Sequence, residues 1–363
     1  MIQPKHFLIA CGGTGGHLSP GIAVAQELTA RGHRCKLLIS EKRVDQALCS
    51  AYPELAFIPL SGVGFSKKLS NLPRCFLAAF KNILQSFRLL RNTKADAVIG
   101  FGGFTNVGIV LAAKFLRKPC FLHEANRIPG RAVRVLGRWA TVVYVPEIFQ
   151  NQQHLRMKVC GFPIRREFQK VDKAVAKQQL GFDPKKLLLV VVGGSQGARV
   201  LTQWAREHIE DFKRHDIQLL CLTGVRNGGE NTEVTASFAS DLSFRFIPFC
   251  HQMHIVYSAA DVVIGRAGAG TIAELTVCET PSILVPFPTS ADGHQRANAR
   301  AFEQQGGCVC LEQSDLTKLW EKALELFSDK EKRFEMSERL RTLNTIDATR
   351  MMVTDIERML GTV

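Results

Sequence analysis

Residues 8–17 read LIACGGTGGH and join a short apolar run to a loop with four glycines. The stretch that follows, with Pro20, Ile22 and Leu28, has the spacing of a helix. A glycine loop between a strand and a helix lets the backbone approach a ligand and points free N–H groups at negative charge. The spacing matches neither the dinucleotide fingerprint nor a Walker loop. His17 closes the loop, where it is either a chemically active group or a cap of the helix.

The two halves of the chain repeat this pattern. Residues 95–103 (ADAVIGFGG) are echoed by residues 260–268 (ADVVIGRAG), and the opening loop has a counterpart in the GGSQGA of residues 193–198. Apolar runs that alternate with helical patterns are typical of buried parallel strands. We therefore predict an α/β protein with two tandem Rossmann-like, doubly wound domains. The expected boundaries are 1–160, 161–340 and a terminal helical segment, 341–363.

The composition is that of a globular protein. The chain has 363 residues, of which 46% are hydrophobic, so it can bury a core in each of two domains. No stretch reaches the roughly 18 apolar residues of a spanning helix, and the first apolar run is too short for a signal peptide. Eleven cysteines without a Cys-x-x-Cys pair favour reduced thiols over a zinc site or a disulfide framework.

The positive charge lies in the first half of the chain. Residues 1–160 hold 22 Lys and Arg against 7 Asp and Glu, a net charge of +15. Residues 161–363 hold 25 against 26, a net charge of −1, and the two values sum to the +14 of the whole chain. A half with this charge is expected to meet an anionic partner, either a nucleic acid or a lipid surface.

The segment between Glu54 and Asp96 contains seven basic residues and no acidic one. A loop at residues 62–68 precedes apolar residues at helical spacing, and a second basic cluster follows within residues 114–138. One interpretation is a core-facing helix with a solvated basic face. The other is a membrane-binding surface, which the coincidence of both clusters favours. The helical positions are Phe76, Phe80, Ile83, Leu84, Phe87 and Leu90, beside Arg74, Lys81 and Arg88.

Residues 265–275 read GRAGAGTIAEL, in which small residues separate a strand from a helix. The first N–H groups of such a helix point to the carboxyl ends of the strands, where a phosphate or pyrophosphate fits. Glu274 lies about one turn into this helix, where a carboxylate can accept two neighbouring ribose hydroxyls. Alternatively, Glu274 only complements the positive end of the helix dipole.

Five motifs together resemble the MurG family of glycosyltransferases. They are GGTGGH at 12–17, HEAN at 123–126, GGSQGA at 193–198, residues 266–274, and HQRANA at 294–299. The resemblance implies a GT-B fold: two Rossmann-like domains with a cleft between them, an acceptor held by the first, a donor held by the second, and a terminal helix that returns to the first. It also implies inverting transfer of N-acetylglucosamine from UDP-N-acetylglucosamine to the 4-hydroxyl of the muramoyl sugar of lipid I, which gives lipid II for peptidoglycan synthesis.

The resemblance implies roles for single residues. His17 is the candidate base for the attacking hydroxyl, and Glu124 is a second candidate. Backbone N–H groups near Ser195 and Thr271 would meet the charge of the departing UDP. Because no Asp-x-Asp occurs in the chain, we expect chemistry without a metal or another cofactor. The other implied substrate-binding residues are Thr14, Gly15, Gly16, Asn126, Arg165, Cys250, Ala269, Gly270, Ile272, Ala273, Glu274 and Gln295.

The expected partners are UDP-N-acetylglucosamine, undecaprenyl-linked lipid I and the anionic surface of the bacterial inner membrane. The protein would be peripheral on the cytoplasmic face, and other cell-wall synthesis proteins are further candidate partners. Two alternatives stay open within enzymes: another glycolipid glycosyltransferase and a UDP-N-acetylglucosamine epimerase. A nucleic-acid-binding module is the alternative from another class. We expect no nucleic acid, because zinc spacing, a helix-turn-helix signal and aromatic-interleaved basic strands are missing from the sequence.

Overall fold

The chain folds into two compact units in the computed structural model. Unit 1 comprises Met1–Arg166 and Ile346–Val363, and unit 2 comprises Glu167–Thr345. The expected boundaries after residues 160 and 340 fall a few residues before these divisions. Thr14, Ser195 and the loop at residues 62–68 lie outside the described residues. The structure describes residues 3–13, 15–41, 43–60, 72–103, 105–152, 154–194, 198–224, 243–344 and 347–362.

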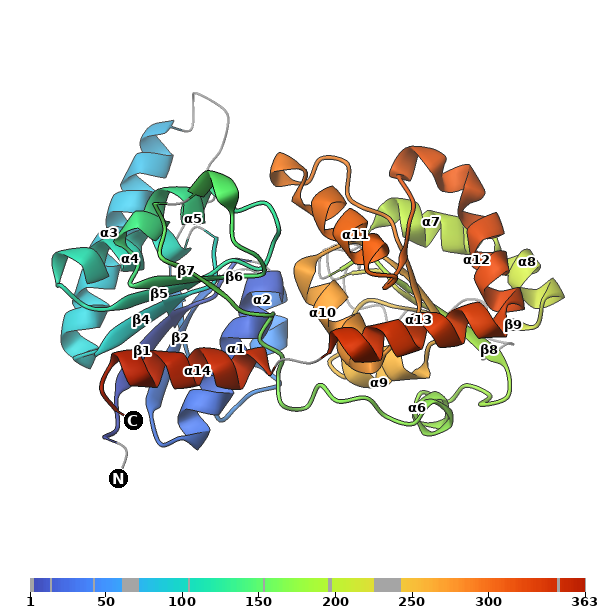
Figure 1. Cartoon of the computed structure of the whole chain (residues 1–363), viewed down its shortest axis with the longest axis horizontal. Coiled ribbons are helices and arrows are strands. Elements are labelled where there is room, and N and C mark those ends of the chain that lie inside the picture. Colours follow the sequence, from blue (N-terminus) through green and yellow to red (C-terminus); the bar gives the residue numbers. More distant parts are fainter. Residues whose placement is uncertain are drawn as a thin grey trace. The chain divides into compact units, whose positions relative to one another are not determined.

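Unit 1 is built on a parallel sheet of seven strands in the order β3-β2-β1-β4-β5-β6-β7. Helices α3, α4 and α5 cover one face of the sheet, and α1 and α14 lie on the other (Figure 1). The strands are β1 (His6–Ala10), β2 (Arg34–Ser40), β3 (Ala56–Leu60), β4 (Ala97–Gly100), β5 (Cys120–His123), β6 (Val142–Val145) and β7 (Met157–Val159). The helices are α1 (Gly15–Ala30), α2 (Arg43–Cys49), α3 (Leu72–Thr93), α4 (Thr105–Phe115), α5 (Arg131–Leu136), η2 (Gly137–Trp139), η3 (Gln150–Gln152) and α14 (Ala348–Met359).

The core of unit 1 follows from the alternation of side chains along its strands. Leu8 and Ala10 of β1 face the same side as Val98 of β4, and they pack with Leu90 of α3 and Ile109 of α4. Neighbouring strand residues turn to the opposite face, because successive side chains of a strand alternate. Strands buried on both faces explain the continuous apolar runs in the sequence.

Unit 2 is built on a parallel sheet of six strands in the order β10-β9-β8-β11-β12-β13. Its strands are β8 (Leu187–Val192), β9 (Ile217–Leu222), β10 (Phe244–Ile247), β11 (Val262–Gly265), β12 (Ser282–Leu284) and β13 (Val309–Cys310). Its helices are α6 (Lys173–Gln179), α7 (Arg199–Glu207), α8 (Ile209–Arg214), α9 (Met253–Ala259), α10 (Ala269–Cys278), η4 (Ala291–Gly293), α11 (His294–Gln304), η5 (Gln313–Lys318), α12 (Leu319–Ser328) and α13 (Lys330–Leu343). The predicted fold class, two tandem Rossmann-like doubly wound domains, is confirmed.

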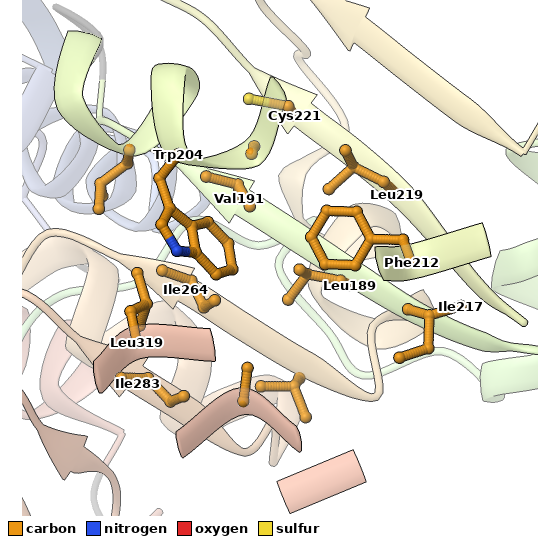
Figure 2. Packing of buried hydrophobic residues seen from close by; sticks show 14 of the residues in the cluster. Leu189, Val191, Trp204, Phe212, Ile217, Leu219, Cys221, Ile264, Ile283 and Leu319 are labelled. Atoms are coloured by element: carbon orange, nitrogen blue, oxygen red, sulfur yellow. The ribbon is translucent and has the colours of Figure 1, made fainter. Parts of the chain in front are cut away.

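The core of unit 2 has an aromatic side. Trp204 of α7 and Phe212 of α8 lie over Leu189, Val191 and Leu219 of the central strands (Figure 2). The Trp204 and Phe212 rings meet edge to face, with centroids 5.9 Å apart. Large side chains of this kind bury enough apolar surface to anchor the short helices α7 and α8, which would be marginal by themselves.

Helix α14 is fastened to unit 1 by two buried carboxylates. Glu357 accepts hydrogen bonds from Arg31 at 2.6 Å and pairs with His33 at 3.0 Å. Asp355 accepts a hydrogen bond from the Tyr144 hydroxyl at 2.9 Å. The terminal segment was expected from residue 341, but residues 341–343 belong to α13 of unit 2, because that helix continues to Leu343.

Helix α3 packs against α4 with polar side chains at the contact. Asn82 and Ser86 are buried, whereas Phe80 and Leu84 are 59% and 41% exposed. Gly108 of α4 allows this contact, since a β-carbon there would lie 2.0 Å from Asn82 Oδ1. The predicted apolar stripe is therefore only partly core. None of the helices within the described ranges is long and apolar enough to cross a bilayer.

Candidate active site

The glycine motifs gather where the strand order of each sheet reverses. This happens between β1 and β4 in unit 1 and between β8 and β11 in unit 2. The paired strands end together, because Ala10 pairs with Gly100 and Val192 pairs with Gly265. Ligands of open parallel sheets bind outside the carboxyl ends of the strands at such a reversal. Each unit thus presents two of the predicted loops at its most favourable ligand position.

His17 lies against the second glycine loop of unit 1. A β-carbon on Gly102 would be 3.0 Å from His17 Nε2, and one on Gly103 would be 3.2 Å from Nδ1. Both glycines have positive φ, 101° and 76°, which other residues rarely adopt. His17 is the third residue of α1, after Gly15 and Gly16, so it does not occupy the capping position. The imidazole is half-buried beside the loop that follows β4.

Glu124 organises the loop that follows β5. Its Oε1 accepts hydrogen bonds from the backbone and the side-chain amide of Asn126, both at 2.9 Å. Its Oε2 accepts a hydrogen bond from the Gly130 backbone at 2.7 Å. A buried carboxylate that is bound on both oxygens by its own loop is suited to hold Asn126 in place. It is less suited to take a proton from a substrate, which favours His17 over Glu124 as the base.

His123 is a buried neutral neighbour of His17. Burial, with a smaller contribution from the nearby His17, lowers the pKa of His123 to about 4, in spite of its 3.1 Å hydrogen bond to the Gly161 carbonyl. The His123 ring also meets Phe162 edge to face, with centroids 6.0 Å apart. His123 therefore adds no positive charge beside His17 near neutral pH.

Arg165 is buried within unit 1, where its Nη1 donates a hydrogen bond to the Tyr52 hydroxyl at 2.8 Å. A guanidinium that is removed from water needs such partners. The residue lies at the end of the first segment of unit 1, which closes at Arg166. This is compatible with either a binding or a structural role.

Helix α10 carries most of the predicted donor-binding residues. It begins after Gly268, and among the described residues no side chain caps it. Residues 269–273 are half-buried. The N–H groups of residues 269–271 precede the first hydrogen bond of the helix, which Ile272 N makes to the Gly268 carbonyl at 3.0 Å, so these three are the natural ligands of an anion at this end of the helix. Glu274 lies in the second turn, and the first turn is the uncharged sequence AGTI. Since the helix dipole acts within the first turn, dipole complementarity explains Glu274 poorly.

Arg266 supports the opposite side of the same region. Its guanidinium donates hydrogen bonds to the carbonyls of Val285 and Pro286 at 3.1 and 3.2 Å, and to the Gln313 side chain at 2.6 Å. Burial lowers the pKa of this arginine. The chain it supports continues to Phe287, whose backbone N–H donates to Gln295 Oε1 at 2.9 Å. Arg266 therefore supports the segment that contacts Gln295, a predicted substrate-binding residue.

Cys250 lies half-buried in the segment after β10, and burial raises the pKa of its thiol. The ten cysteines whose side chains are described are free thiols. Burial also raises the pKa of Cys120 and Cys221 to about 12, so these thiols are poor nucleophiles. A role for Cys250 through its backbone would not need a reactive sulfur.

Sequence reasoning missed Asp45. This residue of α2 is fully buried, and its carboxylate accepts a hydrogen bond from the Gly13 backbone at 2.8 Å. The sequence gives only a weak signal for this residue, which is an aspartate five residues after the end of β2, in the strongly basic first half of the chain. Its partner lies 32 residues earlier in the chain, so no local pattern could have revealed it.

Models of two protein domains match the chain. The glycosyltransferase family 28 N-terminal domain matches residues 7–145, and the family 28 C-terminal domain matches residues 188–350. They cover the two Rossmann-like units in the same order.

Relatives match over nearly the whole length. A protein of Opitutus terrae named UDP-N-acetylglucosamine–N-acetylmuramyl-(pentapeptide) pyrophosphoryl-undecaprenol N-acetylglucosamine transferase is 43% identical over 98% of this chain and 95% of its own. A protein of the same name from Caldanaerobacter subterraneus is 34% identical over 94% of this chain and 96% of its own.

Solved structures give the same result. The crystal structure of MurG from Acinetobacter baumannii is similar with a TM-score of 0.70 and 26% identity, over 98% of this chain and 100% of that one. A structure described as a putative UDP-N-acetylglucosamine 2-epimerase from Listeria monocytogenes has a TM-score of 0.71 over 100% of this chain and 98% of that one. Its sequence identity is only 13%, so the similarity shows the fold alone. By its family domains and its full-length relatives, the chain belongs to glycosyltransferase family 28, in the MurG family.

Proposed function

We propose that the protein transfers N-acetylglucosamine from UDP-N-acetylglucosamine to the 4-hydroxyl of the muramoyl sugar of lipid I, forming lipid II. The observation that carries this proposal is 43% identity over 98% of the chain with a relative named for that transfer. The epimerase alternative rests on a likeness of fold alone.

In this proposal unit 2 binds the donor. Residues 269–273 contact the diphosphate, with the N–H groups of residues 269–271 as donors, and the helix dipole also favours negative charge there. Glu274 accepts hydrogen bonds from the ribose hydroxyls, Cys250 offers its backbone to uracil, and Gln295 contacts the donor sugar or the diphosphate. Ser195 adds a backbone N–H for the departing UDP. The support is an α10 that no described side chain caps and a carboxylate in its second turn.

Unit 1 binds the acceptor in the same proposal. Thr14, Gly15 and Gly16 face the donor, Asn126 reaches the sugar, and Arg165 lies near the substrate. His17 removes the proton from the attacking 4-hydroxyl as that oxygen bonds to the anomeric carbon and the bond to UDP breaks. An α-linked donor then gives a β-linked product. Glu124 holds Asn126 and does not act as a base, which agrees with its three hydrogen bonds. We propose that the step needs no metal.

The protein would reach its lipid-linked acceptor as a peripheral protein on the cytoplasmic face of the inner membrane. The support is the outer side of α3 and α4, where Phe80 and Phe115 are 59% and 71% exposed. Lys81, Arg88 and Lys114 are exposed on the same two helices. Apolar side chains among basic ones favour an anionic lipid surface, at about 1 kcal/mol for each basic residue near it.

The transfer is tested with radiolabelled UDP-N-acetylglucosamine and a lipid I analogue. We expect a β-linked disaccharide product that depends on both substrates. Consumption of the donor without the acceptor would instead indicate the epimerase. Release of UDP with a different glycolipid acceptor, and none with lipid I, would indicate another glycolipid glycosyltransferase.

Membrane binding is tested by co-sedimentation with vesicles that contain anionic lipid. Phe80→Ser should weaken binding by about tenfold, since it removes one exposed aromatic side chain that would insert into the lipid surface. The matched control is Phe334→Ser, which changes a phenylalanine that is 62% exposed on unit 2. Equal loss of binding in both variants would remove α3 from the docking surface.

A further inference from the structure

The carboxylate of Asp45 is buried at the end of β2 and is bound on one oxygen. Its Oδ2 accepts hydrogen bonds from Gly13 N at 2.8 Å, Ser40 N at 3.1 Å and Ser40 Oγ at 2.5 Å. Its Oδ1 is buried without a hydrogen-bond partner in the part of the chain that the structure describes. A buried carboxylate is costly unless strong hydrogen bonds compensate it, and here all three of them are made to Oδ2.

The loop that Asp45 holds is tightly packed at its first glycines. Gly12 lies so close to β2 that a β-carbon there would be 2.3 Å from Ser40 N. Gly13 has φ of 120°, in the region that favours glycine. The backbone N–H of Cys11 and of Gly12 both donate to the Leu38 carbonyl at 3.1 Å. The loop therefore rests on the end of β2, with Asp45 at the point where it turns toward α1.

The same loop contacts the surroundings of His17. The Thr105 hydroxyl donates to the Gly12 carbonyl at 3.2 Å, and a β-carbon on Gly103 would lie 3.0 Å from that carbonyl. The His17 ring lies against Gly103 as well. Gly12, Gly103 and His17 are thus one packed group, which connects the loop at Gly13 to the imidazole.

We propose that Asp45 is a positioning residue, which fixes the loop after β1 and through it the His17 imidazole. The proposal rests on the assignment of His17 as the base in the proposed transfer. The Asp45 contact also agrees with the absence of a dinucleotide fingerprint from this loop. The Gly13 N–H, which a phosphate would take in a nucleotide-binding loop, is bound by a carboxylate of the protein itself.

The test compares Asp45→Asn with Asp96→Asn. Asp96 is the matched control, because its carboxylate accepts a hydrogen bond from His6 N at 2.9 Å, at the opposite end of the same strand β1. Loss of a charge-assisted bond at Gly13 should lower kcat by about 10- to 100-fold, with the KM for UDP-N-acetylglucosamine within about twofold of wild type. Asp96→Asn should leave kcat within about twofold.

Hydrogen exchange followed by mass spectrometry gives a readout that does not need the reaction. Asp45→Asn should speed exchange in a peptide covering residues 11–17, and Asp96→Asn should not. Unchanged exchange in that peptide would overturn the anchoring of the loop, even if the wild type proves to have another substrate. Faster exchange with unchanged kcat would overturn the link to His17.

A second variant covers the case in which Asp45→Asn does not fold. Asp45→Glu keeps the charge but moves the carboxylate by one methylene group. It should show the same two effects, faster exchange in the loop and a lower kcat at an unchanged donor KM. A lower thermal stability with unchanged kcat and unchanged loop exchange would contradict the proposal and indicate a purely structural carboxylate.

Discussion

The two units differ at the places where their strand order reverses, between β1 and β4 in unit 1 and between β8 and β11 in unit 2. In unit 1 the protein fills the position with its own groups: Asp45 binds Gly13, Thr105 binds Gly12, and His17 covers Gly102. In unit 2 the helix after β11 begins after Gly268 without a cap among the described side chains. The first arrangement holds a titratable group rigidly. The second leaves backbone donors for an anion.

The glycines themselves reflect this difference. Gly12 is required by the packing of the protein, since a β-carbon there would be 2.3 Å from Ser40 N. Gly268 has extended φ and ψ of −69° and 142°, which any residue can adopt, and a β-carbon there would meet its nearest neighbour, Thr271 Oγ1, only at 3.6 Å. We infer that the small residue at 268 serves the approach of a ligand.

The largest expected effect is that of His17→Ala. If unit 1 supplies the base, kcat should fall by about two to four orders of magnitude, because a positioned base contributes that much. Donor binding should be nearly intact. Steady-state kinetics with both substrates measures this, and a loss smaller than tenfold would leave His17 as a packing residue of the loop.

Glu274→Ala should have the reverse signature. Loss of hydrogen bonds from ribose to a charged group should raise the donor KM by about 10- to 100-fold and change kcat less, because this contact is similar in the ground and transition states. Titration calorimetry with UDP checks the same quantity without turnover. Unchanged affinity for UDP would remove Glu274 from the donor site.

The glycine comparison is tested by the pair Gly12→Ala and Gly268→Ala. The first should lower the free energy of unfolding by about 1–3 kcal/mol, because the added methyl overlaps backbone. The second should leave stability nearly unchanged but raise the donor KM. Denaturant unfolding and donor titration on both variants decide the matter, and equal destabilisation by the two substitutions would contradict the distinction.

The smallest expected effect is a pH dependence confined to unit 1. The pKa of His123 is lowered by burial from 6.5 to about 4, so the unfolded chain binds this proton more readily. The free energy of unfolding should therefore fall as the pH drops from 6.5 towards 4, and at pH 5 it should be about 2 kcal/mol lower than above pH 7. Hydrogen exchange of strands β4–β6, compared with β8–β11 at pH 7 and pH 5, measures the effect.

The stability of unit 2 should not fall between pH 7 and pH 5, and His123→Gln should remove the pH dependence of unit 1. In unit 2, burial works to raise the pKa of Asp261, but Lys173 and Lys177 outweigh it and hold the pKa below its ordinary value. The contribution of this carboxylate is lost only at lower pH, as it becomes protonated. A parallel loss of protection in both units between pH 7 and pH 5 would assign the effect to another group.

Much of the fold was predictable because its signals are local. Apolar runs such as residues 187–192 mark strands that are buried on both faces, and glycines mark the turns into helices. The two Rossmann-like domains and the family followed from these patterns and from their order. The orientation of α3 did not, because Asn82 and Ser86 face inward only where Gly108 of α4 admits them.

The sequence by itself determined the order of strands and helices, the uneven charge, and the residue types that the chemistry requires. Only the tertiary structure decided which of them meet. His17 contacts Gly102 because parallel strands distant in sequence end at the same edge of a sheet. Asp45 holds Gly13 across 32 residues, and Glu124 is bound by its own loop. Contacts of this kind depend on the pairing of strands and on side-chain packing, which no local pattern of residues specifies.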